Sequence, residues 1–385
     1  MVLDFLIPVS DKILAHNALL PSQAMGNAIK IHSEKGGLPQ MKGVKLAIFG
    51  VNESRNAFEK KKILLDINAI RKQFYKLMFG NWGATVVDLG DVPQGAAVTD
   101  TYFVVKQLVA SLLDDKIVPI VIGATQDITY PIYRAFDHLN QMVNLVTIDS
   151  RFDFGSQDAI ISSHSYMSRI ITEKPNILFN FSNLGYQSYF NAQEELDLMD
   201  KLFFDRYRLG EVSAELQIAE PVLRYAHLVS LDVRAIKASE MGGSESFSPN
   251  GFDGREICSL SRYAGLSDSV QVFGVFESEN HSNASQLVGQ IIWYFIEGFN
   301  LRQKEHPLAA PENFLKYTVT LENHDLVFYR SLMTQRWWVG VSFLDSIDNK
   351  KGIPALLACT ENDYIAACDN KIPERWFKAQ KKGFI

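Results

Sequence analysis

Three aspartates and two arginines follow apolar runs of the sequence, at positions where a hydrolytic centre could form. Asp149, Arg151 and Asp153 lie in Val146-Thr-Ile-Asp-Ser-Arg-Phe-Asp153, and Asp232 and Arg234 end Leu231-Asp-Val-Arg234. Carboxylates are ligands for hard divalent cations, but arginine has only donors and stays protonated, so it cannot coordinate a metal. If each strand continues, its arginine and aspartate share one face. The pattern predicts a cluster of carboxylates and guanidinium groups.

A structural role is the alternative for the two aspartates that end apolar runs. An aspartate at a strand end often accepts a hydrogen bond from the following turn, so Asp149 and Asp232 taken singly are explained by capping. The repeated Asp-x-Arg pattern favours an internal cluster, because bidentate pairing satisfies both partners. Desolvation cancels much of this attraction, whereas removing one partner of a buried pair typically costs about 3 to 5 kcal/mol.

Short β-branched runs alternate with longer helical patterns along the first 300 residues. This alternation predicts an α/β fold, with a parallel sheet and helices on both faces. We expect strands at 44–51, 117–123, 143–149, 176–181, 227–233 and 270–276, and helices at 58–78, 101–113, 127–139, 193–204 and 285–299. Asn283 or Ser285 is expected to cap the last helix.

Reactive groups of such folds gather beyond the carboxyl ends of the strands. The polar residues that follow predicted strand ends are Gln126, Asp149, Asp153, Asp232 and Glu277. We therefore expect these five side chains to converge on one crevice.

The pattern changes after Pro311, where the apolar residues recur with a period of two. Three antiparallel strands are expected at 316–321, 326–331 and 336–343, then a helix at 361–368 and a basic tail at 378–382. We expect an N-terminal segment (1–43) packed on the core, an α/β domain (44–310) and a docked C-terminal β extension (311–385), with a separately folding unit as the alternative. Trp337 and Trp338 point to opposite faces of a strand, so one is expected in the core and the other as an exposed anchor for a partner.

Composition excludes several classes of function. A net charge of -6 does not provide the clustered basic excess of a general nucleic-acid surface. Only three cysteines are present, so neither a disulfide framework nor a zinc ribbon is expected. No apolar run approaches the roughly 18 residues of a membrane span, and the N-terminus lacks a basic leader. We expect a cytoplasmic protein.

The order of these segments resembles the ureohydrolases: arginase, agmatinase and especially formiminoglutamase. Residues 44 to 300 carry the resemblance, through Asp88-Leu-Gly-Asp-Val-Pro, the helix after Asp100-Thr-Tyr, Ile117-Val-Pro-Ile-Val-Ile-Gly-Ala124 and the later strands that end in aspartate. It implies a three-layer arginase-like fold. Active members of this family hold two manganese ions with a glycine-rich loop ending in His, an Asp-Ala-His-x-Asp strand end and an Asp-x-Asp strand end.

This sequence departs from the family's metal motifs at three positions. Gln126 replaces the first His, Arg151 the second, and Arg234 the final carboxylate. By resemblance, one metal position would use Gln126, Asp149, Asp153 and Asp232, and the other Asp149, Arg151, Asp232 and Arg234. The second position has lost two ligands and gained two cations, whose repulsion at about 4 Å costs several kcal/mol where water is scarce. We expect no cofactor, and the alternative is one divalent cation, manganese or magnesium, at the first position.

Two further residues resemble functional groups of the family. Glu277 resembles the glutamate that receives the guanidinium or formimino group of the substrate, and His164 resembles a proton-shuttling histidine. The structural alternatives are an ion pair between Glu277 and a nearby basic group, and an ordinary, partly buried loop position for His164. For Gln126, a structural hydrogen bond is the alternative to a remnant ligand.

Three functions remain open at this point. The first is a ureohydrolase-fold pseudoenzyme that lacks the dinuclear site and acts as a binding or scaffold protein for an unidentified protein partner. The second is a formiminoglutamase-like hydrolase of linear amidines with a mononuclear or rearranged metal site. The third is a small-molecule sensor, for which the arginines favour an anionic ligand. Homo-oligomers are usual in the family.

Overall fold

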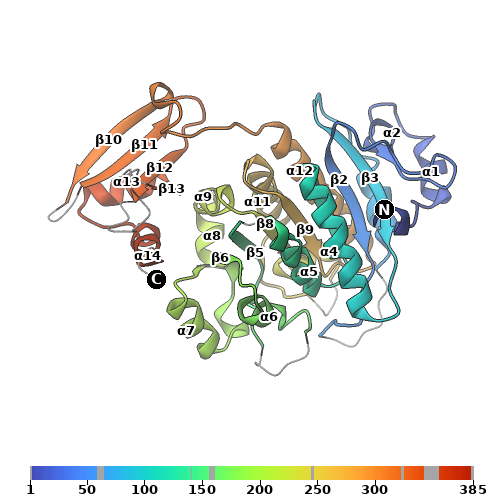
Figure 1. Ribbon diagram of the computed structural model, residues 1–385, viewed down its shortest axis with the longest axis horizontal. Coiled ribbons are helices and arrows are strands. Elements are labelled where there is room, and N and C mark those ends of the chain that lie inside the picture. The colour runs from blue at the N-terminus through green and yellow to red at the C-terminus, as the bar shows by residue number, and fades with distance from the viewer. Residues whose placement is uncertain are drawn as a thin grey trace.

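A nine-stranded parallel sheet forms the centre of the molecule (Figure 1). The computed structural model describes residues 2–58, 65–139, 141–155, 161–243, 247–321, 325–341 and 355–382. The strand order is β1-β3-β2-β4-β9-β8-β5-β6-β7. The strands are β1 (Lys30–Ile31), β2 (Val44–Val51), β3 (Thr85–Val92), β4 (Val118–Gly123), β5 (Val143–Ile148), β6 (Leu178–Tyr186), β7 (Asp205–Arg208), β8 (Leu228–Asp232) and β9 (Val272–Phe276).

Helices cover both faces of this sheet, which confirms the predicted three-layer fold. One face packs against α3 (Ile67–Phe74), α8 (Leu209–Ala214), α9 (Ala219–Arg224), α11 (Gly254–Leu266) and α12 (Ser282–Asn300). The other packs against α4 (Val98–Asp114), α5 (Thr129–Arg134), α6 (Tyr166–Thr172) and α7 (Gln193–Lys201). The short helices α1 (Asp11–Asn17), α2 (Met25–Ala28) and α10 (Ala238–Met241) complete this part. No helix among the described residues is long and apolar enough to cross a bilayer.

Five of the six strands predicted for this sheet are present with shifts of at most two residues at their ends, and β6 continues five residues beyond its predicted end. The prediction missed β3, whose sequence includes two aspartates and a glycine. Asp88 of this strand is fully buried, and Arg71 of α3 donates to both of its carboxylate oxygens, at 2.9 and 3.1 Å. Tyr75 donates to the same carboxylate at 2.8 Å, and Arg71 also bonds Asp91 at 2.9 Å. A charge is tolerated inside this strand because the facing helix supplies its partner.

Three predicted helices differ from the observed ones. Residues 59–64 of the expected helix 58–78 lie outside the described part of the chain, and α3 occupies 67–74. The expected helix 127–139 divides into a 3-10 turn (Gln126–Ile128), α5 and a second 3-10 turn (Ala135–His138). The last helix begins at Ser282, and the His281 ring accepts a hydrogen bond from the backbone N–H of Asn283. The proposal that Asn283 or Ser285 is the N-cap was therefore wrong.

A separate four-stranded antiparallel sheet follows the first sheet (Figure 1). Its elements are β10 (Phe314–Thr320), β11 (Asp325–Ser331), β12 (Trp337–Val341), β13 (Ala355–Cys359), α13 (Glu361–Cys368) and α14 (Glu374–Lys382). The strand β13 was not predicted, residues 342–343 of the third expected strand lie outside the described part, and the basic tail forms the end of α14.

Both adjacent tryptophans of β12 are buried, so the expected exposed anchor was wrong. Trp337 stacks on Tyr364 and Tyr317 inside the C-terminal sheet unit. Trp338, on the opposite face, lies 4.5 Å from the guanidinium carbon of Arg224, which belongs to α9 of the first domain. Arg224 also donates to the carbonyl of Trp337 at 2.8 Å. The second face of the strand is covered because the C-terminal sheet packs on the first domain.

The cluster around Arg71 allows a direct test of its contribution to stability. Arg71→Met leaves Asp88 buried without its cation, and we expect it to lower the free energy of unfolding by about 3 to 5 kcal/mol. Arg262→Met is the matched control: Arg262 pairs with Glu297 at 2.9 Å, but its side chain is 37% exposed, so a loss below about 1 kcal/mol is expected. Urea unfolding of both variants measures the difference. Equal losses would contradict the role given to Arg71.

Candidate functional site

The carboxyl ends of β4, β9, β8 and β5, neighbours in the sheet, bring the predicted polar residues together. The backbone N–H of Gln126 donates to the Glu277 carboxylate at 2.9 Å, which joins the loop after β4 to the loop after β9. The Gln126 side chain donates to the Ser230 hydroxyl of β8 at 3.3 Å. This is the structural hydrogen bond considered for Gln126. Asp149, Asp153 and Asp232 are buried at the same edge.

Asp149 and Asp232 cap turns, because neither strand continues past them. The Asp149 carboxylate accepts from the backbone N–H of Arg151 at 2.8 Å, and that of Asp232 from the backbone N–H of Arg234 at 2.7 Å. A 3-10 turn (Val233–Ala235) begins directly after β8. The condition for a shared strand face, that each strand continues to its arginine, is therefore not met, and the aspartates bond the arginine backbone.

The two guanidinium groups find other partners within the crevice. Arg234 forms an ion pair with Glu277 at 3.1 Å, and the two side chains are only 19% and 4% exposed. Arg151 donates to the carbonyl of Phe190 at 2.9 Å, and its guanidinium carbon lies 4.5 Å from the centre of the Phe190 ring. Pairing with one of the same arginines, the alternative considered for Glu277, is the arrangement observed.

The backbone of the crevice adopts left-handed conformations at two residues that are not glycine. Asp153 has φ of 55° and Glu277 has φ of 64°. Such conformations are uncommon for residues with a Cβ and persist where the surrounding contacts fix them. For Glu277 these contacts are the Gln126 N–H and the Arg234 guanidinium.

Burial dominates the ionisation of the crevice carboxyls. It raises the pKa of Asp149 to about 6 against the opposing effect of the Arg151 N–H, and it raises the pKa of Asp232 to about 8 together with the charge of Asp149. The pKa of Asp153 lies well above its usual range, through burial and the charges of Asp149 and Asp232. The pKa of Glu277 rises to about 8 through burial, although Arg234 opposes the shift. Burial thus disfavours the charged form of these carboxyls more than the two arginines stabilise it.

His164 lies at the edge of this cluster. Its ring stacks on Phe58 at 4.2 Å between centroids, and Phe58 is an exposed residue of the loop that follows β2. Burial, together with the positive charges of Arg151 and Arg234, lowers the pKa of His164 to about 4. The imidazole is therefore neutral at physiological pH and carries no proton to donate as an imidazolium.

Comparison with known proteins identifies the family. A model of the arginase family matches residues 46–294, more than half of the chain. The chain belongs to the arginase family. The comparison with curated protein sequences gives no match. Among solved structures, the Trypanosoma cruzi formiminoglutamase with Mn²⁺ is similar with a TM-score of 0.64 and 16% identity, over 73% of this chain and 99% of the other.

Two further solved structures share the fold at low sequence identity. The formimidoylglutamase of Bacillus subtilis has a TM-score of 0.61 and 16% identity, over 69% of this chain and 90% of its own. The agmatine ureohydrolase of Thermoplasma volcanium has a TM-score of 0.58 and 18% identity, over 74% of this chain and 96% of its own. The family model ends before β10, so the C-terminal sheet lies outside the match.

The crevice of this arginase-family chain does not fit a dinuclear manganese centre. Two of the positions that the resemblance assigns to ligands are Arg151 and Arg234, which have no lone pair to offer. Among the described residues, no group of three or more His, Cys, Asp or Glu side chains has a geometry that holds a metal ion. The first position retains two buried acceptors, Gln126 Oε1 and Asp149 Oδ2, that find no hydrogen-bond partner in the described part of the chain.

Several residues that hold this crevice together were not predicted from the sequence. Phe190, which lies 39 residues from Arg151, and Ser230, inside β8, carry no motif that marks them. Glu53 follows β2 and is fully buried, so it offered the same strand-end signal as the predicted residues. Its carboxylate accepts from Arg55 at 2.5 and 2.9 Å and from Thr101 at 2.8 Å. Glu53 therefore holds the loop that carries Phe58 against α4.

The hydrogen bonds of Glu53 predict a loss of stability in acid. Burial alone would raise its pKa, but the bonds from Arg55 and Thr101 outweigh burial and lower the pKa from 4.5 to about 2. A depressed carboxyl pKa contributes stability that is fully present above 4.5 and is lost as pH falls toward 2. The gap in unfolding free energy between wild type and Glu53→Gln should therefore shrink between pH 6 and pH 3. Denaturant titrations measure this gap, and a constant gap would contradict the assignment.

Proposed function

We propose that this chain is a pseudoenzyme of the arginase family that acts as a binding or scaffold protein. The ion pair between Arg234 and Glu277 carries the proposal. By resemblance, Glu277 is the carboxylate that receives the cationic group of a substrate. In this chain a guanidinium of the protein itself lies 3.1 Å from that carboxylate. A substrate amidine would have to displace a tethered cation from Glu277, which leaves the Arg234 guanidinium without its partner.

Loss of the nucleophile supports the same proposal. Family chemistry uses a water activated between two metal ions. Arg151 and Arg234 replace two ligands, and they add positive charge where a second ion would bind. His164, the candidate proton shuttle, has a pKa of about 4 because it is buried beside both arginines. Neither a metal-bound nucleophile nor a cationic acid is supplied by these residues at neutral pH.

The C-terminal sheet supports a role in binding. It lies beyond the end of the family match at residue 294, and Arg224, Trp338 and Arg375 fasten it to the first domain. Arg375 of α14 donates to the carbonyl of Pro221 in α9, a helix of the layer that covers the sheet. The C-terminal sheet thus adds a surface, fixed to the first domain, that lies outside the family match. We assign the contact with a protein partner to this surface.

Manganese titration with a restored site tests the proposal. Wild-type protein that has been loaded with excess Mn²⁺ and then desalted should retain close to zero manganese ions per chain. Its guanidinium groups repel the ion and offer no lone pair for coordination. The triple variant Gln126→His, Arg151→His and Arg234→Asp restores the family's ligand types and should retain about two ions per chain. Elemental analysis measures the ratio. The triple variant with Asp232→Ala added is the matched control and should lose the gain.

Two manganese ions per wild-type chain would contradict the proposal. One ion per chain would favour the second candidate function, a formiminoglutamase-like hydrolase with a mononuclear site. The unpartnered oxygens of Gln126 and Asp149, together with Asp153 and Asp232, are the observation behind it. Turnover of formiminoglutamate, agmatine and arginine, abolished by Asp232→Ala, separates this candidate from a silent protein that binds one ion.

A further inference from the structure

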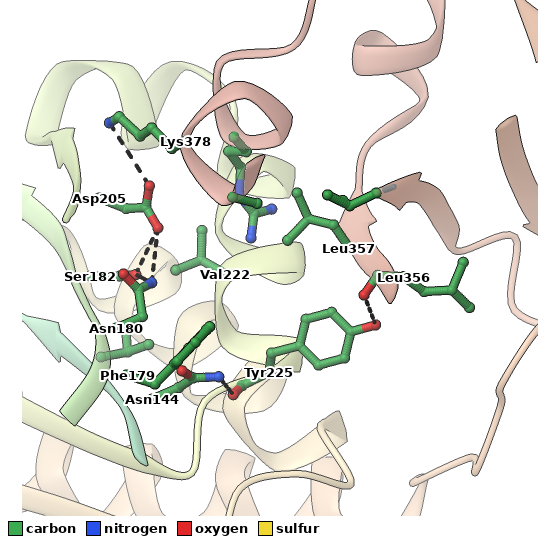
Figure 2. A pocket seen from close by; sticks show the side chains of 14 residues that line it. Asn144, Phe179, Asn180, Ser182, Asp205, Val222, Tyr225, Leu356, Leu357 and Lys378 are labelled. Atoms are coloured by element: carbon green, nitrogen blue, oxygen red, sulfur yellow. Dashed lines mark hydrogen bonds and ion pairs between the residues drawn. The ribbon is translucent and has the colours of Figure 1, made fainter. Parts of the chain in front are cut away.

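A cavity of about 260 Å³ lies between the first domain and the C-terminal sheet, away from the crevice (Figure 2). Its walls come from the beginnings of β5 and β6, from α9, and from β13 and α14. Asn144 and Val146 of β5 line it, whereas Asp149 of the crevice follows the opposite end of the same strand. The cavity therefore belongs to a different end of the sheet.

Apolar side chains form most of the cavity wall. Val222 and Tyr225 face it from the first domain and Leu357 faces it from β13, whereas Leu356 borders it with its carbonyl group (Figure 2). The Tyr225 hydroxyl donates to the carbonyl of Leu356 at 3.3 Å, which fixes the two sides of the cavity relative to each other. Phe179, 53% exposed, also lines the cavity. These walls suit an apolar chain or ring.

One end of the cavity is cationic. Among its described lining residues, Arg375 and Lys378 of α14 carry positive charge and Asp205 of β7 carries the one negative charge. Asp205 is held mainly by Asn180 at 3.0 Å and Ser182 at 3.3 Å, and its oxygen lies 3.8 Å from Lys378. The closer partner of Lys378 is Glu374 at 2.9 Å, whose side chain is 79% exposed and weakly held.

Among the described residues, the Arg375 guanidinium donates hydrogen bonds to two backbone carbonyls, which are neutral acceptors. It donates to the carbonyl of Ala358 at 3.0 Å and to that of Pro221 at 3.3 Å. A guanidinium has five N–H donors in a fixed plane, so donors remain for an anion. The same three residues, Asp205, Arg375 and Lys378, also line a second, more polar cavity of about 360 Å³. The charged end of the apolar cavity is thus the wall that the two cavities share.

We propose that the apolar cavity binds a small amphipathic monocarboxylate. Its carboxylate accepts from Lys378 and Arg375, where the lining carries a net positive charge, and its apolar body lies between Val222 and Leu357. A cavity of about 150 Å³ holds benzene, so this volume accommodates roughly ten non-hydrogen atoms. The ligand contacts both the first domain and the C-terminal sheet, and binding therefore stabilises their packing.

Octanoate, with ten non-hydrogen atoms, is the probe for the full-length protein. Isothermal titration calorimetry should show saturable binding of octanoate, weaker binding of octanol and no binding of octylammonium. The three probes share an alkyl chain and differ in the charge of the head group. Lys378→Gln removes a charge-assisted hydrogen bond and should weaken octanoate binding about tenfold. Lys381→Gln, on the same helix but outside the cavity lining, is the matched control and should bind as wild type does.

A second variant tests the location without changing charge. Ala379→Phe places a ring in the cavity and should abolish octanoate binding while the circular dichroism spectrum of the protein is unchanged. Three results would overturn the proposal: no binding of octanoate at millimolar concentration, equal binding of octanol and octanoate, or equal effects of Lys378→Gln and Lys381→Gln.

Discussion

Neutralisation of buried negative charge at the carboxyl edge of the sheet is the constraint on which the structure of the crevice depends. Parallel strands that end side by side bring Asp149, Asp153, Asp232 and Glu277 into one buried space. Buried carboxylates without cations are costly, and they either protonate or acquire partners. This chain supplies two guanidinium groups, and the pKa values of Asp232 and Glu277 remain raised because burial outweighs the attraction of Arg234.

Guanidinium groups also fix the surrounding scaffold at three other places. Arg71 neutralises Asp88 inside β3, and Arg55 binds Glu53 in the loop that follows β2. Arg224 pairs with Glu220 while its guanidinium lies over Trp338, so one side chain satisfies a charge and docks the C-terminal sheet. Arginine suits each place because its planar donors bind two acceptors at once and its face packs on aromatic rings. The crevice thus uses the same chemistry as the rest of the molecule.

The fold was predictable from sequence where a single physical signal dominated. The apolar run of β2 predicted the bounds of that strand. The predicted helix 361–368 coincides with α13, whose start is fixed by a capping box in which Thr360 and Asp363 bond each other's backbone. Prediction failed for β3, because the charge of Asp88 hides the strand until Arg71 is placed beside it. It failed for Trp338, since the covering surface comes from a helix more than 100 residues away.

The sequence predicted which residues lie together at the site, but not which side chains bind each other there. Strand ends identified which residues meet, because that follows from parallel topology. Which arginine binds which carboxylate depends on the turns after β5 and β8, and on partners such as Phe190 that no local pattern marks. Anomalous diffraction at the manganese edge, from crystals grown with Mn²⁺, tests the central claim most directly. We predict no pair of manganese peaks between Asp149 and Asp232, with the Arg234 guanidinium on Glu277, whereas two peaks with both arginines turned toward solvent would contradict it.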